Sequence, residues 1–221
     1  MNKTEVLGQL LGGSVALIGW LIFFLSLYLA LLFAFGAGWS FKNTIRHIKN
    51  LLPAGGVAFS SGSSLSTMPW TIEGTQKNLQ DQELAKAIIP ATTNIQQIGD
   101  CFANTFICFL IYTGFYGEVP DLWMWLSFSF AFVAARFATA AVLGGAIFVM
   151  LPIYEKYLHF TPEMTAIILA FNVVLDPIIT SANVLANGAL CRLFELFWNK
   201  ISYSFSKKAT VSIWFVPGKK R

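Results

Sequence analysis

The residues best suited to chemistry form a polar stripe inside an apolar segment near the C-terminal end of the chain. They are Asn172, Asp176, Thr180, Asn183 and Asn187. Their spacings of 4, 4, 3 and 4 residues place all five on one face of a helix. A carboxylate at the centre of a membrane-spanning helix costs roughly 2.5–3.5 kcal/mol on insertion scales, and such residues usually mark a ligand or ion pathway. The stripe therefore predicts a site for a small polar molecule or a cation.

A second stripe lies earlier in the chain and has the same helical spacing. It consists of Thr93, Gln97, Asp100 and Asn104. Hydroxyl, amide and carboxylate oxygens are ligands for hard cations, and they also bind amino and carboxylate groups. Hydrogen bonding between helices explains any single amide equally well, but two parallel stripes favour a binding site.

Arg136 also lies in an apolar stretch, although it is charged. We expect it to pair with Asp100, which would leave the side-chain end of a binding pocket neutral. Two alternatives remain open at this point. The arginine can pair with Asp176, or it can extend its charged end to the membrane interface.

The composition indicates which elements must position these residues. The chain is 56% hydrophobic and 12% charged, whereas soluble domains carry about 25% charged residues. No charge lies between Glu5 and Lys42, and a spanning helix needs only about 20 apolar residues. We therefore predict an all-α, multi-pass membrane protein.

The distribution of charge predicts the orientation of the chain in the membrane. Basic residues gather in 42–49, in 77–86 and in the C-terminal tail, and acidic residues gather in 118–121 and 155–163. Cytoplasmic segments carry an excess of lysine and arginine. We predict a cell-membrane protein with a cytoplasmic C-terminus. The clustering of the net charge of +4 near apolar segments argues against nucleic acid as a partner.

The same asymmetry predicts two hairpins that enter the membrane and return. Residues 42–49 and 77–86 lie on one side, and the serine- and glycine-rich stretch from Val57 to Pro69 lies between them. Residues 118–121 and 155–163 lie on the other side, with the sequence from Thr139 to Ala146 between them. Two short crossing helices at 122–151 are the alternative for this second stretch.

These elements form an inverted repeat, an arrangement that places transporter sites near the bilayer midplane. We predict a transmembrane helix at 1–41, a re-entrant hairpin and broken transmembrane helix at 42–116, a second such pair at 117–205, and a basic cytoplasmic tail at 206–221. His47 and His159 are expected in solvated loops.

Across roughly 5–200, the sequence resembles the C-terminal half of the dicarboxylate/amino acid:cation symporters, the glutamate-transporter family. Ser63, Ser64, Thr67, Met68 and Pro69 match the serine-rich tip of that family's first hairpin. In the last span, Asp176 matches the aspartate that binds the substrate amino group. Asn183 matches the asparagine that binds its carboxylate, and Thr180 matches a threonine between them.

The resemblance implies a secondary active transporter of amino acids or related small carboxylates, coupled to Na⁺ or H⁺. It also implies a homotrimer or a separate scaffold chain as partner. Compared with the family, the N-terminal scaffold helices are missing, so we expect one product of a split gene pair or a truncated relic. The implied substrate-binding residues are Ser63, Ser64, Asp100, Asp176, Thr180 and Asn183. The implied cation-binding residues are Asn94, Gln96, Thr139, Asn183 and Asn187.

The sequence also departs from the family pattern at several of these positions. Two aspartates that help bind sodium are replaced by Ile98 and Asn187, and the arginine that binds acidic side chains is replaced by Ile179. The proline of the second hairpin tip is Leu143. These changes predict weak sodium coupling and a neutral substrate, with a basic amino acid that meets Asp100 as the alternative.

Two other functions fit parts of the sequence. The chain can be an inactive or scaffold membrane subunit without its N-terminal half. Asp100 and Asp176, in separate membrane helices, also suit an intramembrane aspartyl protease. The glycine-x-glycine-aspartate sequence of such proteases is missing, however, because position 97 is Gln97.

Overall fold

The computed structural model describes the backbone of residues 3–138 and 145–213, and the side chains mainly of 18–137 and 149–202. All regular structure in these ranges is helical, which confirms the predicted all-α class. The helices are α1 (Lys3–Gly36), α2 (Phe41–Ser61), α3 (Ser64–Gln76), α4 (Gln82–Thr92), α5 (Ile98–Tyr116), α6 (Leu122–Ala138), α7 (Gly145–Leu158) and α8 (Pro162–Ile213).

Three of the described helices are long and apolar enough to cross a membrane. The qualifying segments are Ile18–Gly36 of α1, Ile98–Tyr116 of α5 and Pro162–Ser202 of α8. Only a minority of the residues in their most apolar windows are buried. The remaining apolar side chains are therefore available to lipid, as expected for a membrane protein.

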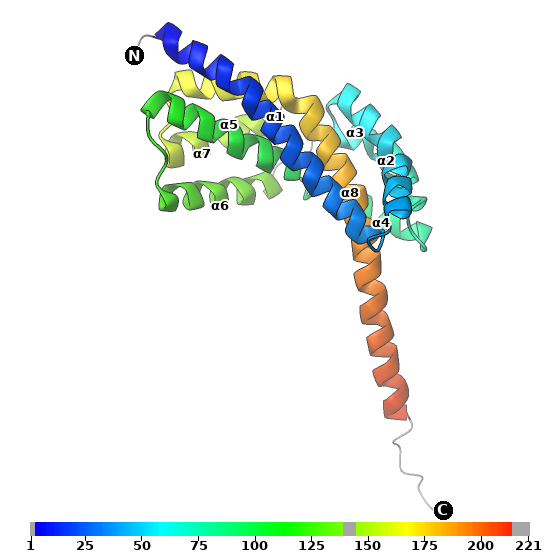
Figure 1. The fold of residues 1–221 in the computed structure, drawn as a ribbon. Helices are drawn as coiled ribbons and strands as arrows, with labels where there is room; N and C mark the ends of the chain where they lie inside the picture. Colours follow the sequence, from blue (N-terminus) through cyan, green and yellow to red (C-terminus); the bar gives the residue numbers. More distant parts are fainter. Residues whose placement is uncertain (1–2, 139–144, 214–221) are drawn as a thin grey trace, which may run out of the picture.

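The first predicted hairpin is formed by α2 and α3, which pack against each other (Figure 1). Its turn lies at Gly62, whose φ of 60° is a left-handed conformation that suits glycine. The hydroxyl of Ser63 then caps α3 by accepting a hydrogen bond from the backbone N–H of Ser66 at 3.3 Å. The turn falls within the predicted stretch from Val57 to Pro69.

The first broken helix is also present, as α4 followed by α5. Residues 93–97, between the two helices, are not helical. The hydroxyl of Thr93 donates to the carbonyl of Ile89 at 2.7 Å, and the hydroxyl oxygen of Thr92 lies 2.8 Å from the carbonyl oxygen of Ile88. Such side-chain bonds compete with the backbone hydrogen bonds that would continue the helix, and the interruption follows directly after them.

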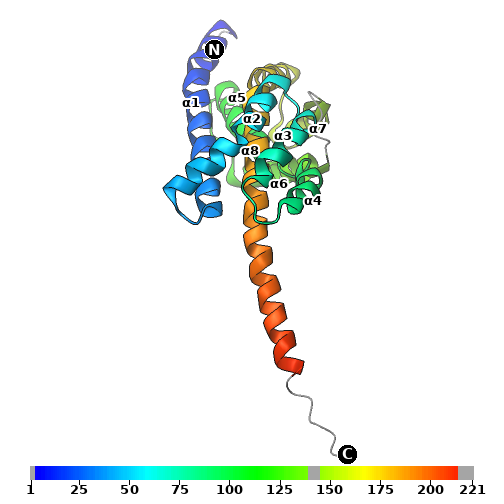
Figure 2. The same cartoon turned by 90° about the vertical axis from the view of Figure 1, so that its right-hand side faces the viewer.

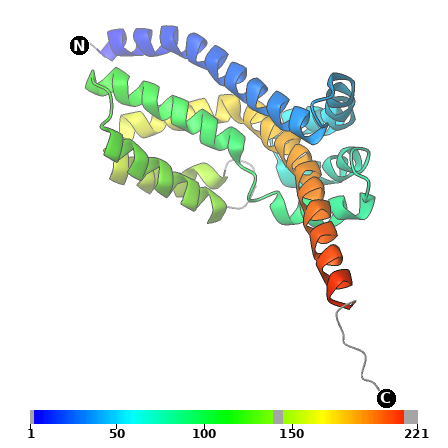
Figure 3. The same cartoon turned by 60° about the horizontal axis from the view of Figure 1, so that its bottom comes forward.

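The second half of the chain matches the prediction only in part. Helices α6 and α7 pack against each other, while the predicted tip at Thr139 and Leu143 lies outside the described residues. The predicted break in the last span is wrong, because α8 is continuous from Pro162 to Ile213 and so runs past position 205. Helix α8 changes direction instead (Figure 3). Pro177 lies inside it, and an internal proline removes one hydrogen bond and bends a helix.

Two groups of helices lie on either side of α1 and α8. Helices α5, α6 and α7 form one group, and α2, α3 and α4 form the other (Figures 1 and 3). In the view of Figure 2, α1 lies at one edge of the molecule and α8 runs through its centre. Leu175, Ile179 and Ala182 of α8 pack into the apolar core of the first group. Val184 and Ala189 pack into the core shared with α2. The polar stripe of α8 thus lies where the helix passes from one core to the other.

Helix α2 has two kinds of residue on its exposed side. Phe41, Ile45, Leu52 and Phe59 expose apolar side chains along its whole length. The exposed Lys42, Arg46 and Lys49 are confined to its first half. His47 faces the opposite way and is only 5% exposed, so the prediction that it is solvated is wrong.

Candidate substrate-binding site

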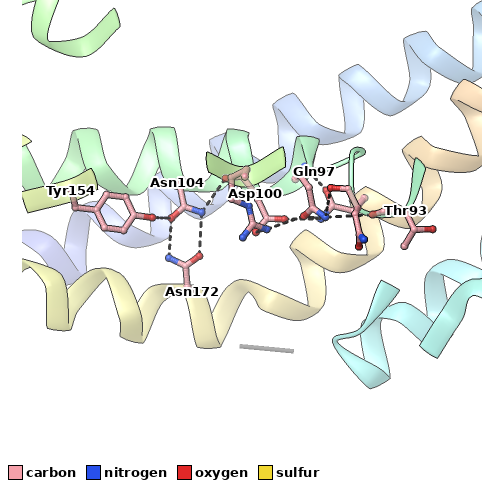
Figure 4. Close-up of polar contacts among 10 residues, drawn as sticks. Thr93, Gln97, Asp100, Asn104, Tyr154 and Asn172 are labelled. Atoms are coloured by element: carbon pink, nitrogen blue, oxygen red, sulfur yellow. Dashed lines mark hydrogen bonds and ion pairs between the residues drawn. The ribbon is translucent and has the colours of Figure 1, made fainter. Parts of the chain in front are cut away.

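The two predicted stripes lie where α8 contacts α5 and the end of α4, because Thr93 and Gln97 of the first stripe fall in the non-helical stretch between these two helices. At one end, Asn104 and Asn172 exchange hydrogen bonds, with Nδ2–Oδ1 distances of 3.2 and 3.0 Å (Figure 4). The hydroxyl of Tyr154 on α7 donates to Asn104 Oδ1 at 2.7 Å. At this end, hydrogen bonds between helices explain the presence of both amides. Tyr154 links α7 to the same pair of asparagines.

Four polar side chains meet at the centre of the contact. They come from α6, α8, α5 and the residue that directly precedes α5. Arg136 Nη2 donates to Asp100 Oδ1 at 2.6 Å and to Gln97 Oε1 at 2.8 Å. Asn183 Nδ2 donates to Asp100 Oδ2 at 2.7 Å. The side chains of Arg136 and Asp100 are only 8% and 14% exposed. The predicted pair between Arg136 and Asp100 is confirmed.

Gly99 allows α5 to approach α8 closely at this point. Its backbone N–H donates to Asn183 Oδ1 at 2.8 Å. A Cβ at this position would lie 2.5 Å from the carbonyl oxygen of Ile179. The amide of Asn183 therefore has both its oxygen and its nitrogen bound to the start of α5.

The far end of the α8 stripe binds the end of α4. Asn187 Oδ1 accepts a hydrogen bond from the hydroxyl of Thr92 at 2.6 Å. Asn187 Nδ2 lies 3.4 Å from Thr93 Oγ1 and 3.5 Å from the carbonyl oxygen of Ile89. In this structure Asn187 therefore attaches α8 to the broken helix.

Asp176 lies in a different environment from Asp100. It is partly exposed, and the hydroxyl of Thr180 one turn later interacts with its carboxylate. Asp100 and Arg136 lie within electrostatic reach of it. Asp176 forms no ion pair with any other residue that the structure describes. The carboxylate retains free capacity to bind a cationic group.

The remaining predicted site residues lie elsewhere or have other contacts. The hydroxyl of Ser63 bonds to Ser66 within hairpin α2–α3. Ser64 is buried, and no described hydrogen bond links it to Asp176. Gln96 lies beside Tyr28 of α1. Asn94 is exposed at the break between α4 and α5, and Thr139 lies outside the described residues.

Two residues with polar contacts at the site were not among the residues predicted from the sequence. Tyr154 lies in an apolar, aromatic-rich segment, and nothing in its spacing distinguishes it from a core tyrosine. Thr92 directly precedes the predicted stripe, and its hydroxyl oxygen lies 2.6 Å from Asn187 Oδ1. Ile179, which takes the place of the family's arginine, is 2% exposed and packs in the apolar core.

Comparison with known families identifies the family to which these elements belong. Residues 2–195 match the sodium:dicarboxylate symporter family, a stretch that includes both stripes and both helical hairpins. Comparison with curated proteins and with solved structures finds no match. The match covers most of the chain and confirms the predicted family, a membrane location and a transport role of the symporter type. The chain belongs to the sodium:dicarboxylate symporter family.

Proposed function

We propose that the chain is the substrate-carrying part of a secondary transporter, and that Asp176 binds the ammonium group of an amino acid. The observation that carries this proposal is the contrast between the two carboxylates of the site. Asp100 is neutralised by Arg136, whereas Asp176 is partly exposed and forms no ion pair with any residue that the structure describes. A charge-assisted hydrogen bond from an ammonium group is the strongest contact open to such a carboxylate.

The substrate carboxylate needs its own donors. The family resemblance assigns this role to Asn183, whose Nδ2 donates to Asp100 at 2.7 Å. For substrate to bind there, this nitrogen must exchange Asp100 for the substrate carboxylate. The oxygen of Asn183 keeps its bond from Gly99, which holds the amide in a fixed orientation during the exchange.

The side chain of the substrate is expected to be neutral. A buried carboxylate needs a cation or several donors. Arg136 is already bound to Asp100, and Ile179 offers neither charge nor donor. Glutamate and aspartate would therefore bury an unpaired charge, while alanine and serine would not.

Uptake by purified protein in proteoliposomes tests this function. We expect uptake of labelled alanine or serine, with glutamate as a weak competitor. Glutamate as the tightest ligand would contradict the assignment of a neutral side-chain pocket. A folded protein with no uptake of any amino acid would favour the alternative of a non-transporting membrane subunit.

The geometry argues against the protease alternative. Aspartyl proteases use two carboxylates that share a proton because like charges at short range cannot both ionise. Asp100 instead binds the cation of Arg136 and the amide of Asn183. A peptide cleavage assay with the same preparation is expected to show no activity.

A further inference from the structure

Arg136 occupies a position where a coupling cation would find suitable ligands. Its Nη2 lies 2.6 Å from a carboxylate oxygen of Asp100 and 2.8 Å from the amide oxygen of Gln97. Both oxygens belong to hard ligands of the kind that alkali and alkaline-earth cations bind. Gln97 directly precedes α5, at the break where the carbonyls of Thr93 and Asn94 accept from its Nε2 at 3.4 and 3.5 Å. The arginine thus places a permanent positive charge among these oxygens.

The burial of Asp100 makes this charge necessary. Its side chain is 14% exposed, and a buried carboxylate without a counter-charge is strongly destabilising. Arginine remains protonated at all physiological pH values. The pair therefore needs neither a metal cation nor a proton from solvent to stay neutral.

The arginine also joins the second hairpin to the rest of the site. Arg136 lies in the last turn of α6, whereas Asp100 lies in the first turn of α5. Its ion pair links this hairpin to α5. Among the described residues, the bond from Tyr154 of α7 to Asn104 is a further polar link.

We propose that Arg136 is a built-in counter-cation, which holds hairpin α6–α7 against α5 without a bound metal ion at Asp100. This rests on the proposed transport function, and it assigns to this chain a form of the site that is independent of sodium. It also implies a latent cation site. If the guanidinium is removed, the oxygens of Asp100 and Gln97 become free to bind Na⁺ in its place.

The link through α7 makes the proposal testable in a folded protein. Tyr154 is fully buried, and Phe128 and Phe132 of α6 lie against it with ring centroids 6.1 Å away. These apolar contacts keep the two helices of the hairpin together when the charge of Arg136 is removed. The variant Arg136→Gln retains much of the side chain and one donor group.

The first experiment measures the melting temperature of the purified protein in detergent, in NaCl and in choline chloride of equal ionic strength. It needs no substrate, so its outcome does not depend on whether the transport proposal holds. We expect no sodium effect on the wild-type protein and a clear rise in the melting temperature of Arg136→Gln with sodium. The double variant Asp100→Asn/Arg136→Gln has no charge to neutralise, so its melting temperature should not change with sodium.

Two controls separate charge from packing. Arg136→Lys keeps the positive charge and should remain independent of sodium. Lys156→Gln removes an exposed cation from the same hairpin and should behave as the wild type. Wild-type protein that sodium stabilises as strongly as Arg136→Gln would overturn the proposal. A folded Arg136→Gln without a sodium response would also overturn it.

If Arg136→Gln does not fold in either salt, the neutral double variant decides. Its folding would support a role for charge, whereas its failure to fold would show that the arginine acts through packing and would contradict the proposal. In proteoliposomes, sodium should raise amino acid uptake by Arg136→Gln about 5–150-fold, the usual range for coupling between two ligands. Uptake by the wild type should not change.

Discussion

At the scale of single residues, environment separates the roles of two aspartates on neighbouring helices. Asp100 accepts bonds from Arg136 and Asn183 and is nearly buried. Asp176 has the hydroxyl of Thr180 as a neighbour, has no ion-pair partner among the described residues, and is partly exposed. A carboxylate whose charge is already balanced has little affinity left for a ligand cation. The structure therefore favours Asp176 over Asp100 as the group that binds a substrate ammonium.

Replacing Asp176 with asparagine should weaken binding of a neutral amino acid about ten- to hundredfold. Hydrogen bonds to charged groups contribute about 1.5–3 kcal/mol, which corresponds to this range of affinity. Equilibrium binding of labelled alanine to purified protein measures the change. Glu155→Gln, which neutralises an exposed acidic residue of α7, serves as the control. Unchanged affinity in Asp176→Asn would contradict the assigned role.

Gly99 provides a second prediction about a single residue. The Cβ of Gly99→Ala would lie 2.5 Å from the carbonyl oxygen of Ile179 and 3.1 Å from Asn183 Oδ1. Forcing extra atoms into a packed contact costs about 1–3 kcal/mol, so we expect a lower melting temperature in detergent. The matched control is Gly56→Ala on α2, where a Cβ meets nothing within 4 Å. That change should stabilise the helix by up to about 1 kcal/mol.

The sequence was informative about which residues share a helix face, and less so about what each one contacts. Spacing alone placed Asn104 and Asn172 on their stripes. The bond between them depends on the register of α5 against α8, which is determined by close approaches such as that at Gly99. Asn183 was assigned to a ligand, yet it also satisfies the backbone N–H at the start of α5. Such pairings depend on tertiary packing and are not encoded in helical periodicity.

At the scale of elements, the chain was predicted to contain two broken helices, and only the first break is present. The local sequence explains the difference. The break at 93–97 follows two threonines whose hydroxyls lie against carbonyls of α4. At Pro177 the only local disturbance is the missing backbone N–H of the proline, which removes one helical hydrogen bond. Leu175 and Ile179, on either side of it, pack into the same apolar core. This packing favours continuation of the helix through the proline. The sequence therefore predicted the presence of a distortion there, but not its form.

The exposed apolar and basic residues of α2 allow a prediction about how hairpin α2–α3 lies in the membrane. Its exposed cations end at Lys49, and its exposed apolar residues continue to Phe59. Lysine and arginine are stable at the lipid headgroups, whereas aromatic and aliphatic side chains are stable among the acyl chains. We expect α2 to pass from the headgroup region into the bilayer, and α3 to return to the same side.

Thiol labelling in intact cells and in inverted vesicles tests this arrangement. The native Cys101, Cys108 and Cys191 are first replaced by serine or alanine. Lys42→Cys and Lys77→Cys, at the two ends of the hairpin, should react with a membrane-impermeant reagent from the cytoplasmic side only. Phe59→Cys should react from neither side. Labelling of Lys42→Cys and Lys77→Cys from opposite sides would show that the segment crosses the membrane.

At the scale of the whole molecule, one buried carboxylate joins three distant parts of the chain. Glu195 of α8 is 1% exposed. Its Oε1 accepts hydrogen bonds from the backbone N–H groups of Gln80 and Asp81, both at 2.7 Å. Its Oε2 pairs with Arg192, whose Nε donates to the carbonyl of Gly36 at the end of α1 at 3.3 Å. The network connects α8 to α1 and to the turn between α3 and α4.

Removal of this carboxylate should destabilise the whole molecule more than any exposed charge does. Glu195→Ala leaves the guanidinium of Arg192 and two backbone donors without their acceptor, and breaking a buried pair in this way costs about 3–5 kcal/mol. Glu195→Gln should have an intermediate effect because its amide oxygen still accepts from the two N–H groups while the charge is lost. Thermal unfolding in detergent measures both variants.

The control variant is Glu83→Ala. It removes an exposed acid paired with Lys86, and exposed pairs contribute little. Equal melting temperatures for Glu195→Ala and Glu83→Ala would mean that the network does not hold α1, α8 and the α3–α4 turn together.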